Sequence, residues 1–288
     1  MKEERREFLS KGAKLAGGVL LFNTLAKSTL AKEVPNLAQK GEKLKKASIL
    51  GKAQKAGLAK SDPEFLANLE YFAEIEVPQN SEQIKPSLRA KLSLCATIAA
   101  GGQATFKSCL ENALDSGVSA VEIKELVYQS TAYVGLAKSL DYVEFCNTIF
   151  KQRGIKLPLT PQQKIKREQR QEAGLNTQRA IFGEAIDKGN AAAPADLQHI
   201  RRYLSSNCFG DYYTRGGLEL EERELFTLVY LIALGGVEAQ LKGHIQGNLN
   251  MGKNRAYLIE VITALVPYIG YPRTLNALTA LDALTLKK

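Results

Sequence analysis

The chain has 288 residues, of which 45% are hydrophobic, and a formal net charge of +9. This length and composition suit a globular protein of roughly two domains. The charge lies near the N-terminus: residues 1–60 hold 14 Lys/Arg and 5 Asp/Glu, whereas residues 61–288 hold 25 of each. Because the rest of the chain is neutral, the charge balance does not support a nucleic-acid-binding surface in the body of the protein.

The N-terminal segment, residues 1–31, has the features of an export signal in the expected order. Arg5-Arg6 precedes Glu7-Phe8-Leu9, which resembles the twin-arginine signal. The apolar run from Leu15 to Ala26 is too short to span a membrane, and small residues that suit cleavage follow at Thr29-Leu30-Ala31. We therefore expect the twin-arginine export machinery to be a partner and the location to be periplasmic. The alternative is a basic amphipathic helix.

Residues 32–60 are rich in lysine and poor in aromatic residues, which predicts a basic linker or a loosely held helix. The first folded unit is then expected over residues 61–155. Its helices are predicted at 88–100, 104–115, 120–137 and 140–150. Gly101-Gly102 and Gly117 mark helix ends, and Ser119 with Glu122 predicts a capping box.

The stretch from Glu224 to Gly252 predicts two helices that fold back on each other at Gly235-Gly236. Glu224 lies early in the first helix, and His244 lies inside the second. The rise of a helix leaves these two residues offset by only about 4–5 Å along the hairpin axis, so their side chains can meet. A carboxylate beside an imidazole is a candidate acid–base unit, although a lone histidine on an apolar helix is more often a packing residue.

The chain also indicates an internal duplication. Aligning Gly117 with Gly252 keeps one offset of 135 through the next helices, so that Tyr133 corresponds to Tyr268. For the helices that precede Gly117 and Gly252 the offset is 134, so that Arg89 corresponds to Arg223. A repeat of this kind predicts two tandem helical domains, residues 61–155 and 162–288. His244 then aligns with Cys109 or Leu110 and Glu224 with Ala90, so the acid–base pair occurs only in the second half and the first half is a degenerate copy.

Several ordered motifs in the second half resemble the carboxymuconolactone decarboxylase family. They are RQEAGLNTQRAIFGE, FGDYYTRGGLELEERELFTL, LIALGGVEAQLKGHIQGNLNMG and YIGYPRTLNAL, between Gln169 and Leu284. The resemblance implies an all-α fold, like that of the alkylhydroperoxidase D proteins, and assembly into trimers or hexamers. It also implies either cofactor-free lactone decarboxylation or, in the alkylhydroperoxidase D branch, thiol-based reduction of peroxides.

Decarboxylation of a small carboxylated lactone or keto acid requires few groups. His244 is predicted to supply a proton or hold a developing negative oxygen, and Glu224 to fix its tautomer. Arg223 or Arg215 is a candidate to bind the substrate carboxylate, with solvent exposure as the alternative for Arg223. Tyr212 and Tyr213 are predicted to line the pocket or to pack.

Peroxide reduction needs reactive thiols, and the second half lacks the required Cys-x-x-Cys pair because Val237 and Gln240 stand there. Cys95 and Cys109 in the first half are redox candidates, although they are 14 residues apart. The alternative for all four cysteines is that they are small buried apolar residues. A disulfide is permitted in an oxidising compartment, but its connectivity cannot be derived from sequence.

No metal site and no cofactor are predicted, since His199 and His244 are far apart in sequence and no phosphate-binding or dinucleotide-binding motif occurs. We expect a self-associating protein, because the second half has more apolar surface than one hairpin can cover. The residues behind this expectation are Leu228, Ile232, Leu258, Val261, Ile262 and Leu265. Two function classes stay open: an enzyme acting on a small molecule, and a non-catalytic or redox-linked assembly protein with the same fold.

Overall fold

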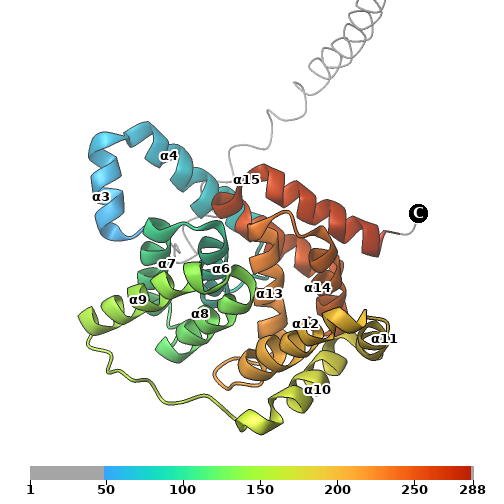
Figure 1. The fold of residues 1–288 in the computed structure, drawn as a ribbon. Helices are drawn as coiled ribbons and strands as arrows, with labels where there is room; N and C mark the ends of the chain where they lie inside the picture. Colours follow the sequence, from blue (N-terminus) through green and yellow to red (C-terminus); the bar gives the residue numbers. More distant parts are fainter. Residues whose placement is uncertain (1–48, 287–288) are drawn as a thin grey trace, which may run out of the picture. The chain divides into compact units, whose positions relative to one another are not determined.

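A computed structural model describes residues 49–286, which belong to one compact unit built from helices (Figure 1). The prediction of an all-α fold is confirmed for this part of the chain. Within it, no helix has both the length and the apolar composition that crossing a bilayer requires. The predicted export signal, residues 1–31, and most of the predicted linker lie outside the described residues.

The described chain begins with short helices that pack on the edge of the main bundle. They are α3 (Lys52–Ser61), α4 (Pro63–Tyr71), the π-helix η3 (Phe72–Glu76) and α5 (Val77–Gln79). Helix α3, at the end of the predicted linker, contains no buried residue. A small cluster of Ile49, Leu50, Leu66 and Ala73 attaches these helices to the rest of the unit.

Four helices of the first half follow, close to the predicted ranges. They are α6 (Pro86–Ala100), α7 (Gln103–Asp115), α8 (Ala120–Val134) and α9 (Leu136–Gln152). The capping box at Ser119 forms as predicted, because its side chain accepts from the Glu122 amide while the Glu122 side chain accepts from the Ser119 amide. Helix α8 ends three residues earlier than predicted, since Gly135 adopts φ 75° and breaks the helical path.

The middle of the chain, which links the two halves, carries several short helices. They are η4 (Arg167–Gln169), α10 (Arg170–Phe182), α11 (Ala185–Ala191), η5 (Ala195–Leu197), α12 (Gln198–Tyr203) and the π-helix η6 (Leu204–Tyr213). Helices α10 and η6 are in unusually close contact. A Cβ atom on Gly174 would lie 1.9 Å from the Ser205 carbonyl oxygen, so the two backbones touch where only glycine leaves room.

The last three helices are α13 (Leu220–Leu234), α14 (Glu238–Asn250) and α15 (Arg255–Thr285). Their lengths repeat those of the first half: α6 and α13 both have 15 residues, and α7 and α14 both have 13. Helix α15 is broken at Gly270, with φ 72° and ψ 172°, much as Gly135 separates α8 from α9 with φ 75° and ψ 165°.

The two halves share one hydrophobic core, in which α13 packs against α6 and α8 (Figure 1). Leu94 and Phe106 of the first half belong to the same cluster as Phe226 and Leu265 of the second. This corrects the expected reason for self-association. The six apolar residues on which it rested are at most 2% exposed, because helices of the same chain cover them; they are Leu228, Ile232, Leu258, Val261, Ile262 and Leu265.

Candidate active site

The Glu224 carboxylate and the His244 imidazole meet between α13 and α14, as the helical rise predicts. His244 Nδ1 lies 2.8 Å from Glu224 Oε1. The hairpin that brings them together turns at Gly235 and Gly236, both with φ 70°, a conformation that glycine adopts without strain. The geometric part of the sequence prediction is therefore confirmed, whereas the catalytic role of the pair stays a prediction.

Glu224 is enclosed on every side, and its side chain is 0% exposed. Its second oxygen, Oε2, accepts a hydrogen bond from the Tyr213 hydroxyl at 3.1 Å. Helix α14 offers a glycine at the point of contact: a Cβ atom on Gly247 would lie 2.3 Å from Glu224 Oε1 and 2.8 Å from the Phe182 ring. Gly247 therefore makes the space in which the carboxylate reaches the imidazole.

A chain of hydroxyl groups continues from Glu224 to the first half of the molecule. Tyr213 and Tyr133 are 3.1 Å apart at their hydroxyl oxygens, and Thr227 donates to Tyr133 at 2.9 Å. Burial raises the pKa of both tyrosines well above the usual value, and the negative charge of Glu224 contributes for Tyr213. Both phenols therefore stay protonated at neutral pH and serve as hydrogen-bond donors.

The His244 ring is held on its sides and open at one end. The rings of Phe182 and Tyr133 lie edge to face against it, with centroid distances of 5.4 Å and 6.3 Å. The side chain keeps 14% of its surface exposed, and Nε2 makes no hydrogen bond to any part of residues 49–286. Because Glu224 accepts at Nδ1, the free Nε2 is the atom available to an incoming molecule.

Asn248 fixes the register of the two helices around this pair. Its amide nitrogen donates to the Glu224 carbonyl at 3.1 Å and to the His244 carbonyl at 2.9 Å. Asn248 is itself fully buried. One side chain thus ties together the backbones that carry both members of the acid–base pair.

Comparison with known proteins identifies the family to which this site belongs. Residues 199–283, from α12 to near the end of α15, match the carboxymuconolactone decarboxylase family. A 106-residue stretch is 30% identical to the 4-carboxymuconolactone decarboxylase of Acinetobacter baylyi (strain ATCC 33305 / BD413 / ADP1), covering 36% of this chain and 78% of the relative. The chain belongs to the carboxymuconolactone decarboxylase family. Glu224 and His244 both lie inside the matched segment, whereas the first sequence motif, in α10, precedes it.

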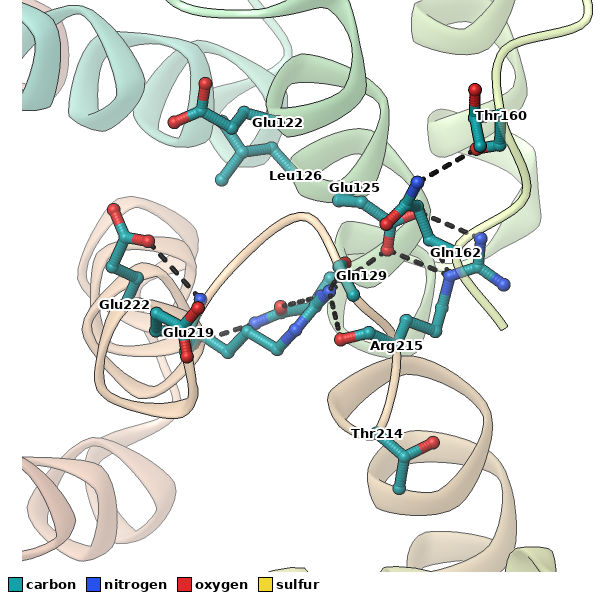
Figure 2. Close-up of polar contacts among 12 residues, drawn as sticks. Glu122, Glu125, Leu126, Gln129, Thr160, Gln162, Thr214, Arg215, Glu219 and Glu222 are labelled. Atoms are coloured by element: carbon teal, nitrogen blue, oxygen red, sulfur yellow. Dashed lines mark hydrogen bonds and ion pairs between the residues drawn. The ribbon is translucent and has the colours of Figure 1, made fainter. Parts of the chain in front are cut away.

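Arg223 neither binds at an open substrate site nor faces solvent, the two positions that the sequence analysis gave for it. Its side chain is 0% exposed, so it does not face solvent, and no nitrogen is open to a substrate carboxylate. Nη2 pairs with Glu125 Oε2 at 3.1 Å and also donates to the carbonyl of Gly216, while Nη1 donates to Gln129 at 3.1 Å. Glu125 and Gln129, which are labelled in Figure 2, both belong to α8. In this family member, Arg223 joins α13 to α8.

The structure also separates Arg215 and Tyr212 from the acid–base pair. Arg215 binds Glu125 with two nitrogens, Nε to Oε2 at 2.8 Å and Nη2 to Oε1 at 2.8 Å (Figure 2). Tyr212 is half-buried and hydrogen-bonds to Thr131, and burial raises its pKa. Within residues 49–286, neither side chain contacts Glu224 or His244. The neighbouring Tyr213 occupies the site instead of Tyr212.

The four cysteines are free and buried, in agreement with the apolar alternative. Burial raises the pKa of Cys95 to about 12 and that of Cys109 to about 11. At neutral pH both are therefore thiols, not the thiolates that attack peroxides. In the described part of the chain, no group of three or more His, Cys, Asp or Glu side chains comes together in a way that could hold a metal ion.

Sequence reasoning missed three residues that shape the site: Tyr133, Phe182 and Gly247. Tyr213 was predicted together with Tyr212, but which of the two faces inward depends on the π-helix η6. Tyr133 comes from the first half and meets Thr227 across 94 residues of sequence. One feature of the sequence pointed to Gly247: glycine inside a helix is unfavourable, so its presence there indicates a close contact with another part of the chain.

Proposed function

We propose that this protein is a cofactor-free decarboxylase of a small carboxylated lactone or keto acid. The observation that carries the proposal is the contact between His244 Nδ1 and Glu224 Oε1, which leaves Nε2 free at the surface of a segment shared with the decarboxylase family. His244 is proposed as the acid–base residue and Glu224 as the residue that positions it.

The reaction breaks the bond between a carbon atom and its carboxylate. The electron pair of that bond moves into a conjugated carbonyl group as carbon dioxide leaves, and a carbon atom then takes up a proton. In the proposed step, the His244 imidazolium donates the proton from Nε2. Glu224 stabilises the imidazolium before the transfer, and afterwards the neutral ring keeps Nδ1–H bonded to the same carboxylate.

A direct assay tests this function. The full chain is incubated with 4-carboxymuconolactone, other carboxylated lactones, β-keto acids and organic peroxides, and carbon dioxide release and peroxide consumption are measured. Release of carbon dioxide from a lactone or keto acid supports the proposal. Consumption of peroxide alone would favour the thiol peroxidase, and inactivity on all four classes would favour a non-catalytic family member.

The thiol-dependent peroxidase remains the alternative function, but no observation favours it. Burial raises the pKa of Cys146 and Cys208, like that of Cys95, to about 12. Tyr133 hydrogen-bonds to Cys208 at 3.4 Å, so this thiol lies near the acid–base pair. A single thiol of high pKa lacks both the thiolate and the resolving partner that peroxide reduction needs.

We further propose that the two halves arose by duplication of one helical domain. The equal helix lengths and the matching breaks at Gly135 and Gly270 support this proposal. So does a reciprocal placement of side chains: Tyr133 hydrogen-bonds to Thr227, and its counterpart Tyr268 lies near Ser93, which acts on its pKa. In this view, the first half keeps the fold and contributes Tyr133 to the site.

Self-association is proposed through the face of α12. Ile200 and Tyr203 are 53% and 60% exposed, and they lie three residues apart on one side of the helix. Exposed apolar patches of this kind mark interaction surfaces. We expect the full chain to sediment as an oligomer, such as a trimer or hexamer, and Tyr203→Glu to shift it towards the monomer. Gln152→Glu, at an exposed position, is the control, and a wild-type monomer at micromolar concentration would contradict the expectation.

Export is proposed to depend on Arg5-Arg6. Twin-arginine recognition requires both guanidinium groups, so replacing both residues with lysine should leave the protein in the cytoplasm. Cell fractionation of the wild type and the double variant measures this effect. Periplasmic accumulation of the lysine variant at the wild-type level would point to a different route.

A further inference from the structure

A cavity of about 450 Å³ lies on the side of α8 that carries Lys124 and Tyr128, between α8, α9 and the segment that links the two halves. Its volume is within the range of small-molecule binding sites. The acid–base residues Glu224 and His244 are not among its lining residues. We call it the Lys124 cavity, after the charged residue that distinguishes it.

Lys124 is a buried cation without an anionic partner. The residue is only 4% exposed, and its ammonium group donates to the Val143 carbonyl at 3.3 Å and to Asn147 Oδ1 at 2.6 Å. Both acceptors are neutral, and within residues 49–286 no carboxylate forms an ion pair with this lysine. A buried charge with no counter-charge is unfavourable, and burial accordingly lowers the pKa of Lys124. An anion in the cavity would supply the missing partner.

A second cation, Arg215, lines the same cavity and also has unused hydrogen-bonding capacity. It binds Glu125 through Nε and Nη2, while its Nη1 has no partner in the described part of the chain. Figure 2 shows the Arg215 guanidinium beside Glu125, next to Gln162 of the linking segment. Glu125 also pairs with the buried Arg223, so one carboxylate is shared by two guanidinium groups. Glu125 itself lines the cavity with Lys124 and Arg215, so the lining carries two cations and one carboxylate and its charge is positive.

The remaining walls suit a molecule with a hydrocarbon part. The Tyr128 ring lies 5.7 Å from Lys124 Nζ and 5.5 Å from Arg215 Cζ, so both cations flank one aromatic surface. Apolar side chains complete the lining, namely Val121, Val143, Leu157 and Leu159. Binding sites for small molecules combine such apolar walls with a few placed polar groups that select the ligand.

We propose that the Lys124 cavity is a second ligand site, which binds a small organic carboxylate with an apolar or aromatic body. The carboxylate contacts Lys124 and Arg215, and the hydrocarbon part contacts Tyr128 and the apolar wall. The proposal does not depend on the function assigned to His244, because the two sites have no lining residue in common. Whether the chain is a decarboxylase or a non-catalytic family member, the cavity keeps this charge and shape.

Calorimetric titration of the full chain with benzoate tests the proposal, with benzamide as a probe of matched shape but no charge. Benzoate should bind, and benzamide should bind about tenfold or more weakly, the usual effect of losing a hydrogen bond between charged groups. Lys124→Met removes the charge and keeps an unbranched side chain, so it should weaken benzoate binding to a similar degree. Lys151→Met, at an exposed position of α9, removes the same charge outside the cavity and should not change the affinity.

Two further measurements keep the outcome decisive. His244→Ala should bind benzoate as tightly as the wild type, and a loss in this variant but not in Lys124→Met would place the carboxylate at His244 and overturn the proposal. Methyl NMR of the wild type should show benzoate-dependent shifts at Val143 and Leu157, and this test needs no variant that has to fold. Absence of benzoate binding at millimolar concentration, or equal affinity for benzoate and benzamide, would also overturn it.

Discussion

Replacing His244 with alanine should lower the turnover of the decarboxylated substrate by about 100- to 10,000-fold, the usual contribution of a positioned proton-transfer group. Nε2 is the free nitrogen of an imidazole whose Nδ1 contacts Glu224, and alanine leaves no group that can deliver a proton from that position. The fold should survive, because the ring contacts Phe182 and Tyr133 only edge to face and keeps 14% of its surface exposed. Steady-state kinetics and circular dichroism on the same preparation measure both effects.

Two companion variants separate the role of His244 from simpler explanations. Glu224→Gln keeps the shape and one hydrogen bond to the ring but removes the charge, so it should lower turnover less than His244→Ala does. Cys109→Ser should leave decarboxylation nearly unchanged, because this thiol is buried outside the pair. If His244→Ala keeps the full rate while Cys109→Ser loses it, the chemistry lies in the first half and the assignment of the site is wrong.

The parts of the fold that sequence predicts here are those set by local chemistry. Glycines at 101, 235 and 252 end helices because they take up positive φ, and the capping box at Ser119 needs only residues three apart. The contact between Glu224 and His244 also follows from local geometry, since one tight turn and a fixed helical rise determine their offset.

The parts that sequence does not predict depend on partners far along the chain. Whether Arg223 faces solvent or the core is decided by Glu125, which lies 98 residues away on α8. The apolar residues of α13 and α15 were expected to need a second copy of the chain, whereas the first half covers them. In each case, the residue type and the hydrophobic periodicity of the helix indicate whether a side chain is polar or apolar. They do not indicate which other helix packs against it.

Arg223→Ala should lower the free energy of unfolding by about 3–5 kcal/mol, because it removes a large, fully buried side chain together with several buried hydrogen bonds. Three acceptors lose their donor in this variant: Gln129 Oε1 and the carbonyl oxygens of Gly216 and Arg215. Glu125 keeps Arg215 as a partner, so the carboxylate is not left alone. The cost arises instead from unsatisfied acceptors and from the volume of a fully buried side chain.

Urea unfolding followed by circular dichroism measures this effect against two matched variants. Arg153→Ala removes an exposed arginine paired with Asp115, whose side chains are 41% and 53% exposed, and should change stability by about 0–1 kcal/mol. Arg223→Lys keeps the charge but cannot reach Glu125, Gln129 and Gly216 together, because an ammonium group lacks the planar fork, so its loss should be intermediate. A loss for Arg223→Ala no larger than that for Arg153→Ala would mean that the Arg223 side chain does not contribute to holding α13 against α8.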